Sequence, residues 1–179
     1  MGKSTLAEAL CVLNGWALLD KDTVAGPLVD VWMRHHTGNP HDRSSAEYLQ
    51  IRDAEYEALL STAAQILLSG AQTVCVVAPF VAEGDLEAVE FTADTHGFTL
   101  RGLWVTCTEE EHRNRILKRA SSRDHDKLAH LADWVANRPC ASSLPDWMRV
   151  FHNDPCTSRE RLASSAGDAL GARGPIPQR

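Results

Sequence analysis

The sequence opens on a short run of residues that could hold phosphate, Gly2-Lys3-Ser4-Thr5. Gly-Lys-Ser-Thr followed by an apolar-patterned helix is the second half of the pattern G-x-x-x-x-G-K-[ST], a phosphate-binding loop between a buried strand and a helix. In such a loop the backbone N–H groups surround phosphate, Lys3 would reach the β- and γ-phosphates, and Ser4 would bind Mg²⁺. The helix N-terminus adds a favourable potential for the anion. The alternative is a chance match in a disordered N-terminus.

Two carboxylates follow the next apolar segment. Residues 16–19 are a candidate for a short buried strand, and Asp20 and Asp22 come directly after it on either side of Lys21. In open α/β sheets, ligands bind at the carboxyl ends of the strands. A carboxylate there could accept a hydroxyl proton during phosphoryl transfer, and we assign this role to Asp22. Asp20 could hold substrate or metal-bound water, and the alternative for either residue is to cap the helix that starts near Val24.

Four arginines form a third group, on and just after a helix predicted from residue 108: Arg113, Arg115, Arg119 and Arg123. Such a cluster can close over phosphates and stabilise the charge that develops on the transferring oxygens. The position one helix after a buried strand, with Ser-Ser-Arg-Asp following, favours Arg119 and Arg123 for this role, whereas Arg113 is predicted at the surface. The alternative is a solvated helix surface with i,i+4 ion pairs, such as Glu111 with Arg115.

The residues that could hold a metal are few. In many phosphate-loop proteins a buried strand ends in an Asp that holds the water shell of Mg²⁺. The apolar strand predicted over residues 73–78 is followed by Pro79-Phe80, with no carboxylate at its end. We therefore expect Mg²⁺ to be bound by Ser4 and the phosphates, or by Asp20. The five scattered cysteines contain no C-x-x-C pair, and the eight histidines show no metal-binding spacing.

Strands and helices alternate along the chain, which predicts an α/β fold with a parallel sheet and helices on both faces. The predicted strands span residues 16–19, 73–78, 98–107 and 148–151. The predicted helices span residues 6–13, 24–37, 44–68, 83–95, 108–119, 127–135 and 158–170. Ser44 and Glu47 resemble a capping box at the start of the longest helix. Residues 1–156 are predicted to form one domain, followed by a C-terminal helix and a disordered tail over 157–179.

Composition limits the classes of partner. The net charge of −6 disfavours an extended polyanion-binding surface, so no nucleic acid is expected. The N-terminus lacks a signal peptide, and the apolar runs are far shorter than the ~20 residues of a membrane helix. The scattered cysteines fit a reducing cytoplasm.

With these groups in place, the chain resembles the small P-loop kinases of adenylate-kinase-like topology, and within them the ATP-binding proteins described as AAA-type. Relatives are chloramphenicol phosphotransferase, shikimate and gluconate kinases and polynucleotide kinase. The resemblance covers residues 2–152 and is carried by GKSTLAEAL (2–10), LLDKDT (18–23), VCVVAPF (74–80) and LWVTCTEEEHRNRILKRASSRDHDKLAH (103–130). The last stretch is the most specific, because its R-x-x-x-R-D-x-x-K-L pattern after an acidic helix start is typical of the lid region in that group.

The resemblance implies a P-loop NTPase fold and the use of ATP and Mg²⁺. The nucleotide would be bound by Gly2, Lys3, Ser4, Thr5 and Arg119; Asp22 would be the catalytic base, and Arg119 and Arg123 lid arginines. The predicted function is transfer of the γ-phosphoryl group of ATP to a hydroxyl of a small-molecule acceptor, in a pocket walled by residues 24–69. Two alternatives remain, a nucleotide-binding NTPase or regulator without an acceptor, and a catalytically inactive fragment.

One departure from the family pattern concerns the start of the chain. The first strand and the front half of the P-loop are missing from the sequence, and the missing strand is the central one in the family. We therefore expect an N-terminally truncated chain, with one strand and the first half of the loop encoded upstream.

Overall fold

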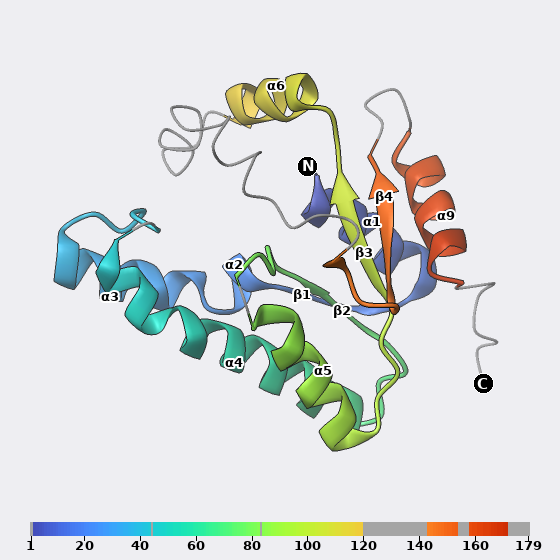
Figure 1. Cartoon of the computed structure of the whole chain (residues 1–179), viewed down its shortest axis with the longest axis horizontal. Helices are drawn as coiled ribbons and strands as arrows, with labels where there is room; N and C mark the ends of the chain where they lie inside the picture. The colour runs from blue at the N-terminus through green and yellow to red at the C-terminus, as the bar shows by residue number, and fades with distance from the viewer. Residues whose placement is uncertain (1, 44, 83, 120–142, 154–157, 172–179) are drawn as a thin grey trace.

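The structure, a computed structural model, describes residues 2–43, 45–82, 84–119, 143–153 and 158–171 (Figure 1). Within them, helices and parallel strands alternate, which confirms the predicted α/β class. The helix predicted over residues 127–135, the lid residue Arg123 and the last eight residues lie outside the described residues.

The described strands form two parallel pairs. Strand β1 (Ala17–Asp20) pairs with β2 (Val74–Val77), with Asp20 opposite Val77, and strand β3 (Gly102–Thr106) pairs with β4 (Met148–His152), with Thr106 opposite His152. Parallel pairing places the carboxyl ends of the two strands of a pair at the same edge. Each pair therefore delivers the residues that follow its strands to one place.

Helices at the two ends of the described chain share a core with the second pair of strands. Helix α1 (Lys3–Asn14) ends at Gly15, whose left-handed backbone (φ 68°) lets its N–H donate to the Cys11 carbonyl. Helix α9 (Arg159–Ala169) lies beside α1, as Figure 1 shows. Their shared core consists of Leu6, Leu10, Val105, Phe151, Ala163 and Ala166. This packing fixes α1, and with it residues 2–5 at the start of the helix, against β3 and β4.

The segment after β1 departs from prediction. The helix predicted over 24–37 is present as α3 (Gly26–Thr37), which begins two residues later than predicted, but a short helix that was not predicted, α2 (Lys21–Val24), precedes it with a break between the two. Pro27 in the first turn of α3 explains the break, since proline has no N–H and its ring clashes with the carbonyl four residues earlier. Helix α2 therefore spans only 4 residues, and it holds the segment after β1 in one tight turn.

A long helix packs against this turn. Helix α4 (Ala46–Leu68) begins at Ser45, whose Oγ accepts a hydrogen bond from the Tyr48 N–H, so the predicted N-cap Ser44 was wrong by one residue. Leu59, which is fully buried, packs in a core cluster with Tyr56 and Ala78 between α4 and the end of β2. Helix α5 (Asp85–His96) contacts α4, and α6 (Glu109–Arg119) follows β3. Among the helices that the structure describes, none combines the length and apolar character needed to cross a membrane.

Candidate functional site

Residues 2–5, which the sequence predicts to bind phosphate and which are called the phosphate-binding segment for that reason, form the N-terminus of α1. Gly2 precedes the helix in the left-handed conformation (φ 78°, ψ 26°), and Lys3 is the first helical residue. The first N–H groups of a helix have no partner within it, and with the helix dipole they attract anions. Ser4 and Thr5 are exposed at this end, and Lys3 is half-buried. This end of α1 therefore offers the N–H groups and the helix dipole that attract an anion.

Gly2 is required here for two separate reasons. Its positive φ is a conformation that other residues rarely adopt, and a Cβ at this position would lie 2.6 Å from Asn153 Nδ2 and 3.1 Å from Arg115 Nη1. Asn153 directly follows β4, and Arg115 lies on α6. Three elements thus meet at this glycine: α1, the end of β4, and α6.

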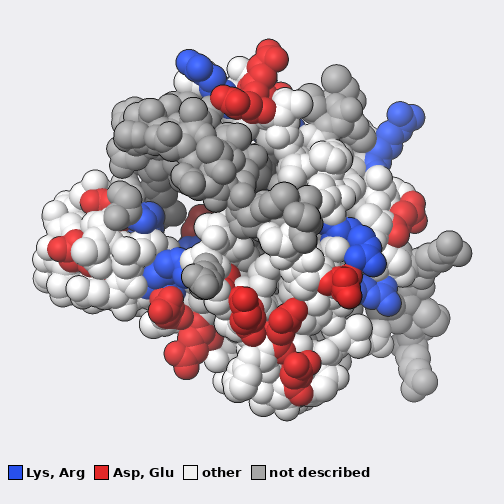
Figure 2. Space-filling view, in the orientation of Figure 1, with Lys and Arg blue, Asp and Glu red and all other residues white. Residues whose placement is uncertain are grey.

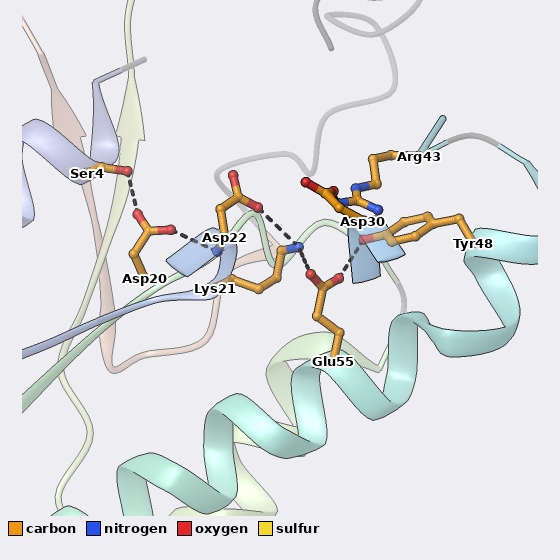
Figure 3. Close-up of polar contacts among 8 residues, drawn as sticks. All are labelled: Ser4, Asp20, Lys21, Asp22, Asp30, Arg43, Tyr48 and Glu55. Atoms are coloured by element: carbon orange, nitrogen blue, oxygen red, sulfur yellow. Dashed lines mark hydrogen bonds and ion pairs between the residues drawn. The ribbon is translucent and has the colours of Figure 1, made fainter. Parts of the chain in front are cut away.

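Asp20 links the first helix to the end of β1. Ser4 Oγ donates a hydrogen bond to Asp20 Oδ2 at 2.6 Å, and Asp20 Oδ1 accepts the Asp22 N–H at 3.0 Å (Figure 3). Asp20 is therefore the N-cap of α2, not of the predicted helix that starts near Val24, whose N-cap is Ala25, and its second carboxylate oxygen accepts from Ser4. Asp22 lies in the first turn of α2 with its carboxylate 64% exposed. The structure thus brings Ser4, Asp20 and Asp22 together.

The Ser4 hydroxyl and the Asp20 carboxylate fit the donor preference of Mg²⁺. Both are oxygen donors, and Mg²⁺ is commonly bound by one or two protein oxygens together with substrate phosphates and water. Among the described residues, no group of three or more His, Cys, Asp and Glu side chains could hold a metal ion by itself. This pair would therefore share the ion with the phosphates of a nucleotide, as the sequence predicts for Ser4.

Lys21 lies buried beside the two aspartates. Its Nζ is 2.8 Å from Glu55 Oε1 and 3.5 Å from Asp22 Oδ1, and its side chain is only 7% exposed (Figure 3). Glu55 Oε2 accepts a hydrogen bond from the Tyr48 hydroxyl at 2.8 Å. Burial raises the pKa of Tyr48, and the hydrogen bond to Glu55 raises it further, so the phenol keeps the proton that it donates.

Lys21, Glu55 and Tyr48 were not predicted from the sequence as site residues. A signal was present on α4, where Glu55 stands seven residues after Tyr48 and four before Leu59, on the apolar face of the helix. A carboxylate on a buried face needs a cationic or hydrogen-bonding partner.

The arginine group is only partly described. Arg115 Nε donates to Glu111 Oε1 at 2.5 Å, which confirms the i,i+4 pair considered from the sequence, and Arg115 Nη2 donates to the Asn153 carbonyl at 3.4 Å. Arg115 therefore lies at the Gly2 end of α1, a position that the sequence alone did not assign to it. Arg113 is exposed, as predicted. Arg119 ends α6 without a described side chain, so its role and that of Arg123 remain predictions.

Two further ion pairs involve helices α3, α4 and α5. Arg52 Nη2 lies 2.8 Å and 2.6 Å from the two carboxylate oxygens of Asp85, and Arg43 pairs with Asp30 at 2.6 Å. These contacts link α4 to α5 and connect the loop after α3 back to α3. Figure 2 shows a hollow above α3, with Lys or Arg side chains at its edge.

Comparisons with known proteins identify the family and the fold of the chain. The profile of a family described as AAA domain matches residues 1–139. A crystal structure of a candidate kinase from Chloroflexus aurantiacus J-10-fl is similar with a TM-score of 0.62 and 20% sequence identity, covering 94% of this chain and 92% of that chain. No curated protein matches the sequence. The matched family and the shared fold are those of P-loop kinase-like proteins, which confirms the resemblance and the fold class predicted from the sequence.

Proposed function

Because the chain belongs to the AAA domain family, with a P-loop kinase-like fold suited to nucleotide binding, we propose that it transfers the γ-phosphoryl group of ATP to a hydroxyl of a small molecule. The observation that carries this proposal is the arrangement of Ser4, Asp20 and Asp22. Ser4 hydrogen-bonds Asp20, and Asp20 caps the helix that presents the exposed Asp22 carboxylate. A candidate base is thus connected through Asp20 to the phosphate-binding segment.

The nucleotide phosphates would bind at the N-terminus of α1. Its first N–H groups and the Lys3 ammonium would hold the β- and γ-phosphates. The Arg115 guanidinium, held beside Gly2 by Glu111 and by the Asn153 carbonyl, adds a second cation at this end. Mg²⁺ would be held by Ser4 and Asp20, and when bound it neutralises charge on the phosphate oxygens.

In the transfer step, the oxygen of the acceptor hydroxyl forms a bond to the γ-phosphorus. The bond between that phosphorus and the bridging oxygen of ADP breaks, and ADP leaves with the electron pair. The hydroxyl proton passes to the Asp22 carboxylate, which is exposed and therefore accessible to an acceptor. Arg119 and Arg123 would offset negative charge on the transferring oxygens. The products are ADP and a phosphomonoester.

A panel assay with γ-labelled ATP tests this function. The protein is incubated with Mg²⁺, labelled ATP and each of a set of sugars, nucleosides, amino alcohols and hydroxylated antibiotics, and the products are separated by chromatography. We expect one class of acceptor to yield a labelled phosphomonoester. A protein that binds ATP but releases only labelled inorganic phosphate with every acceptor is an NTPase or a nucleotide-binding regulator, and this result would refute the proposal.

A further inference from the structure

We propose that Lys21 is a positioning residue that holds the Asp22 carboxylate in place for proton acceptance, and that Glu55 and Tyr48 fix Lys21 for this purpose. The inference rests on the proposed function, because it gives a role to a residue that acts through the candidate base.

The burial of Lys21 is the first observation. Lysine is seldom buried, because its ammonium is strongly hydrated and its long side chain usually reaches solvent. The Lys21 side chain is 7% exposed, and its ammonium lies 5.8 Å from the centroid of the Tyr56 ring. An ammonium in such surroundings needs a partner, and Glu55 provides one at 2.8 Å. Lys21 is therefore confined to one position.

Glu55 is held as firmly as the lysine. Its side chain has no exposed surface, and its second carboxylate oxygen accepts the hydrogen bond of the Tyr48 hydroxyl. The Arg43 guanidinium lies 5.1 Å from the centroid of the Tyr48 ring and pairs with Asp30 on α3. The anchor of Lys21 thus extends through α4 to α3, the two helices expected to wall the acceptor pocket.

Asp22 is consequently held from two sides. Its backbone N–H is bound by Asp20, which is in turn bound by Ser4 of the phosphate-binding segment, and its carboxylate lies 3.5 Å from the Lys21 ammonium. Successive side chains on a helix do not face each other, so the lysine must bend back between Asp22 and Glu55 to contact both, as Figure 3 shows. Lys21 therefore couples the base to the acceptor-side helices, while Asp20 couples it to the nucleotide side.

A double substitution separates positioning from simple structural support. Lys21→Met alone leaves the wholly buried Glu55 without its cation, so a loss of activity in that variant would not distinguish mispositioning from unfolding. Replacement of both members of a buried pair by apolar residues of similar volume is often tolerated. Lys21→Met/Glu55→Met is therefore expected to fold; it removes the cation beside Asp22 and, together with it, the acceptor of the Tyr48 hydroxyl. The matched control is Arg52→Met/Asp85→Asn, which removes another buried ion pair of α4 that does not contact Asp22.

Four measurements are made on the wild type and both double variants: thermal unfolding, the ATP dissociation constant by calorimetry, kcat and KM for the acceptor, and a crystal structure. For Lys21→Met/Glu55→Met we expect a folded protein, an ATP dissociation constant within about twofold of the wild type, an unchanged acceptor KM, and a kcat lowered by about tenfold or more. The Asp22 carboxylate is expected to leave its wild-type position. The control is expected to retain kcat within about twofold.

Two results would overturn the positioning role: a folded Lys21→Met/Glu55→Met variant with wild-type kcat, or one in which the Asp22 carboxylate keeps its place. Failure of the proposed function is a separate result. If the wild type phosphorylates no acceptor, phosphotransfer is refuted, and the position of Asp22 in the crystal structure of the double variant still decides whether Lys21 holds it.

Discussion

Substitution of Gly2 by alanine perturbs the phosphate-binding segment at its most crowded point. A non-glycine residue in the left-handed conformation costs roughly 1–2 kcal/mol. The added Cβ would also lie 2.6 Å from Asn153 Nδ2, and displacing that side chain from its rotamer costs about 0.5–1.5 kcal/mol more. If the start of α1 shifts to relieve this strain, a loss of about 2–3 kcal/mol corresponds to a weakening of ATP binding by roughly 30- to 150-fold. Isothermal titration calorimetry with ATP and Mg²⁺ measures this change.

Gly15→Ala is the matched control, at the other end of the same helix. Gly15 also has a positive φ of 68°, but a Cβ there would meet nothing within 4 Å. This variant should lose about 1–2 kcal/mol of unfolding free energy and keep the wild-type affinity for ATP. If Gly2→Ala binds ATP as tightly as Gly15→Ala does, then Asn153 and Arg115 do not close on the phosphate-binding glycine and the description of the site is wrong.

Two further predictions concern α4. Leu59 has no exposed surface, so Leu59→Ala should lower the free energy of unfolding by roughly 2–5 kcal/mol in urea titrations. Leu49 is 60% exposed on the same helix, and Leu49→Ala should change this free energy by less than about 0.5 kcal/mol. Equal effects of the two substitutions would contradict the assigned core. Burial raises the pKa of Tyr56 to about 12, above the value of about 10 in the unfolded chain, so the folded state holds this proton more tightly. Stability should therefore fall as the pH rises from 10 to 12, by up to about 1.4 kcal/mol per pH unit for this group. Tyr56→Phe should flatten that slope, and an unchanged slope would assign the loss to other groups.

The parts of the site that are close in sequence could be predicted from it. Gly-Lys-Ser-Thr before an apolar helix and two aspartates after a short strand are local patterns, and the structure joins them through the hydrogen bond between Ser4 and Asp20. The two readings of Asp20, a helix cap and a site residue, are compatible, because one carboxylate oxygen caps α2 and the other accepts from Ser4. Pro27, which lies in the first turn of α3 and separates that helix from α2, was also visible in the sequence.

The contacts that could not be predicted join distant segments. Lys21 and Glu55 are far apart in the chain, and only the packing of α4 against the turn after β1 makes them an ion pair. Arg115 carried the local signal of a surface pair with Glu111, which is present, but its approach to Gly2 depends on how α6 and the end of β4 meet α1. Periodicity identifies which face of a helix is buried, but it does not identify what that face contacts.

If Asp22 accepts the proton of an acceptor hydroxyl during transfer from ATP, Asp22→Asn should abolish this step. The amide has nearly the same shape as the carboxylate but is not a base, and Asp53→Asn on the exposed face of α4 serves as the control, since Asp53 is 94% exposed. Once the panel assay with labelled ATP has identified the acceptor, kcat for its phosphorylation can be measured. We predict that Asp22→Asn lowers this kcat by about 10²-fold or more, while the ATP dissociation constant stays within about twofold of the wild type. An Asp22→Asn variant that transfers phosphate at the wild-type rate would exclude Asp22 as the base.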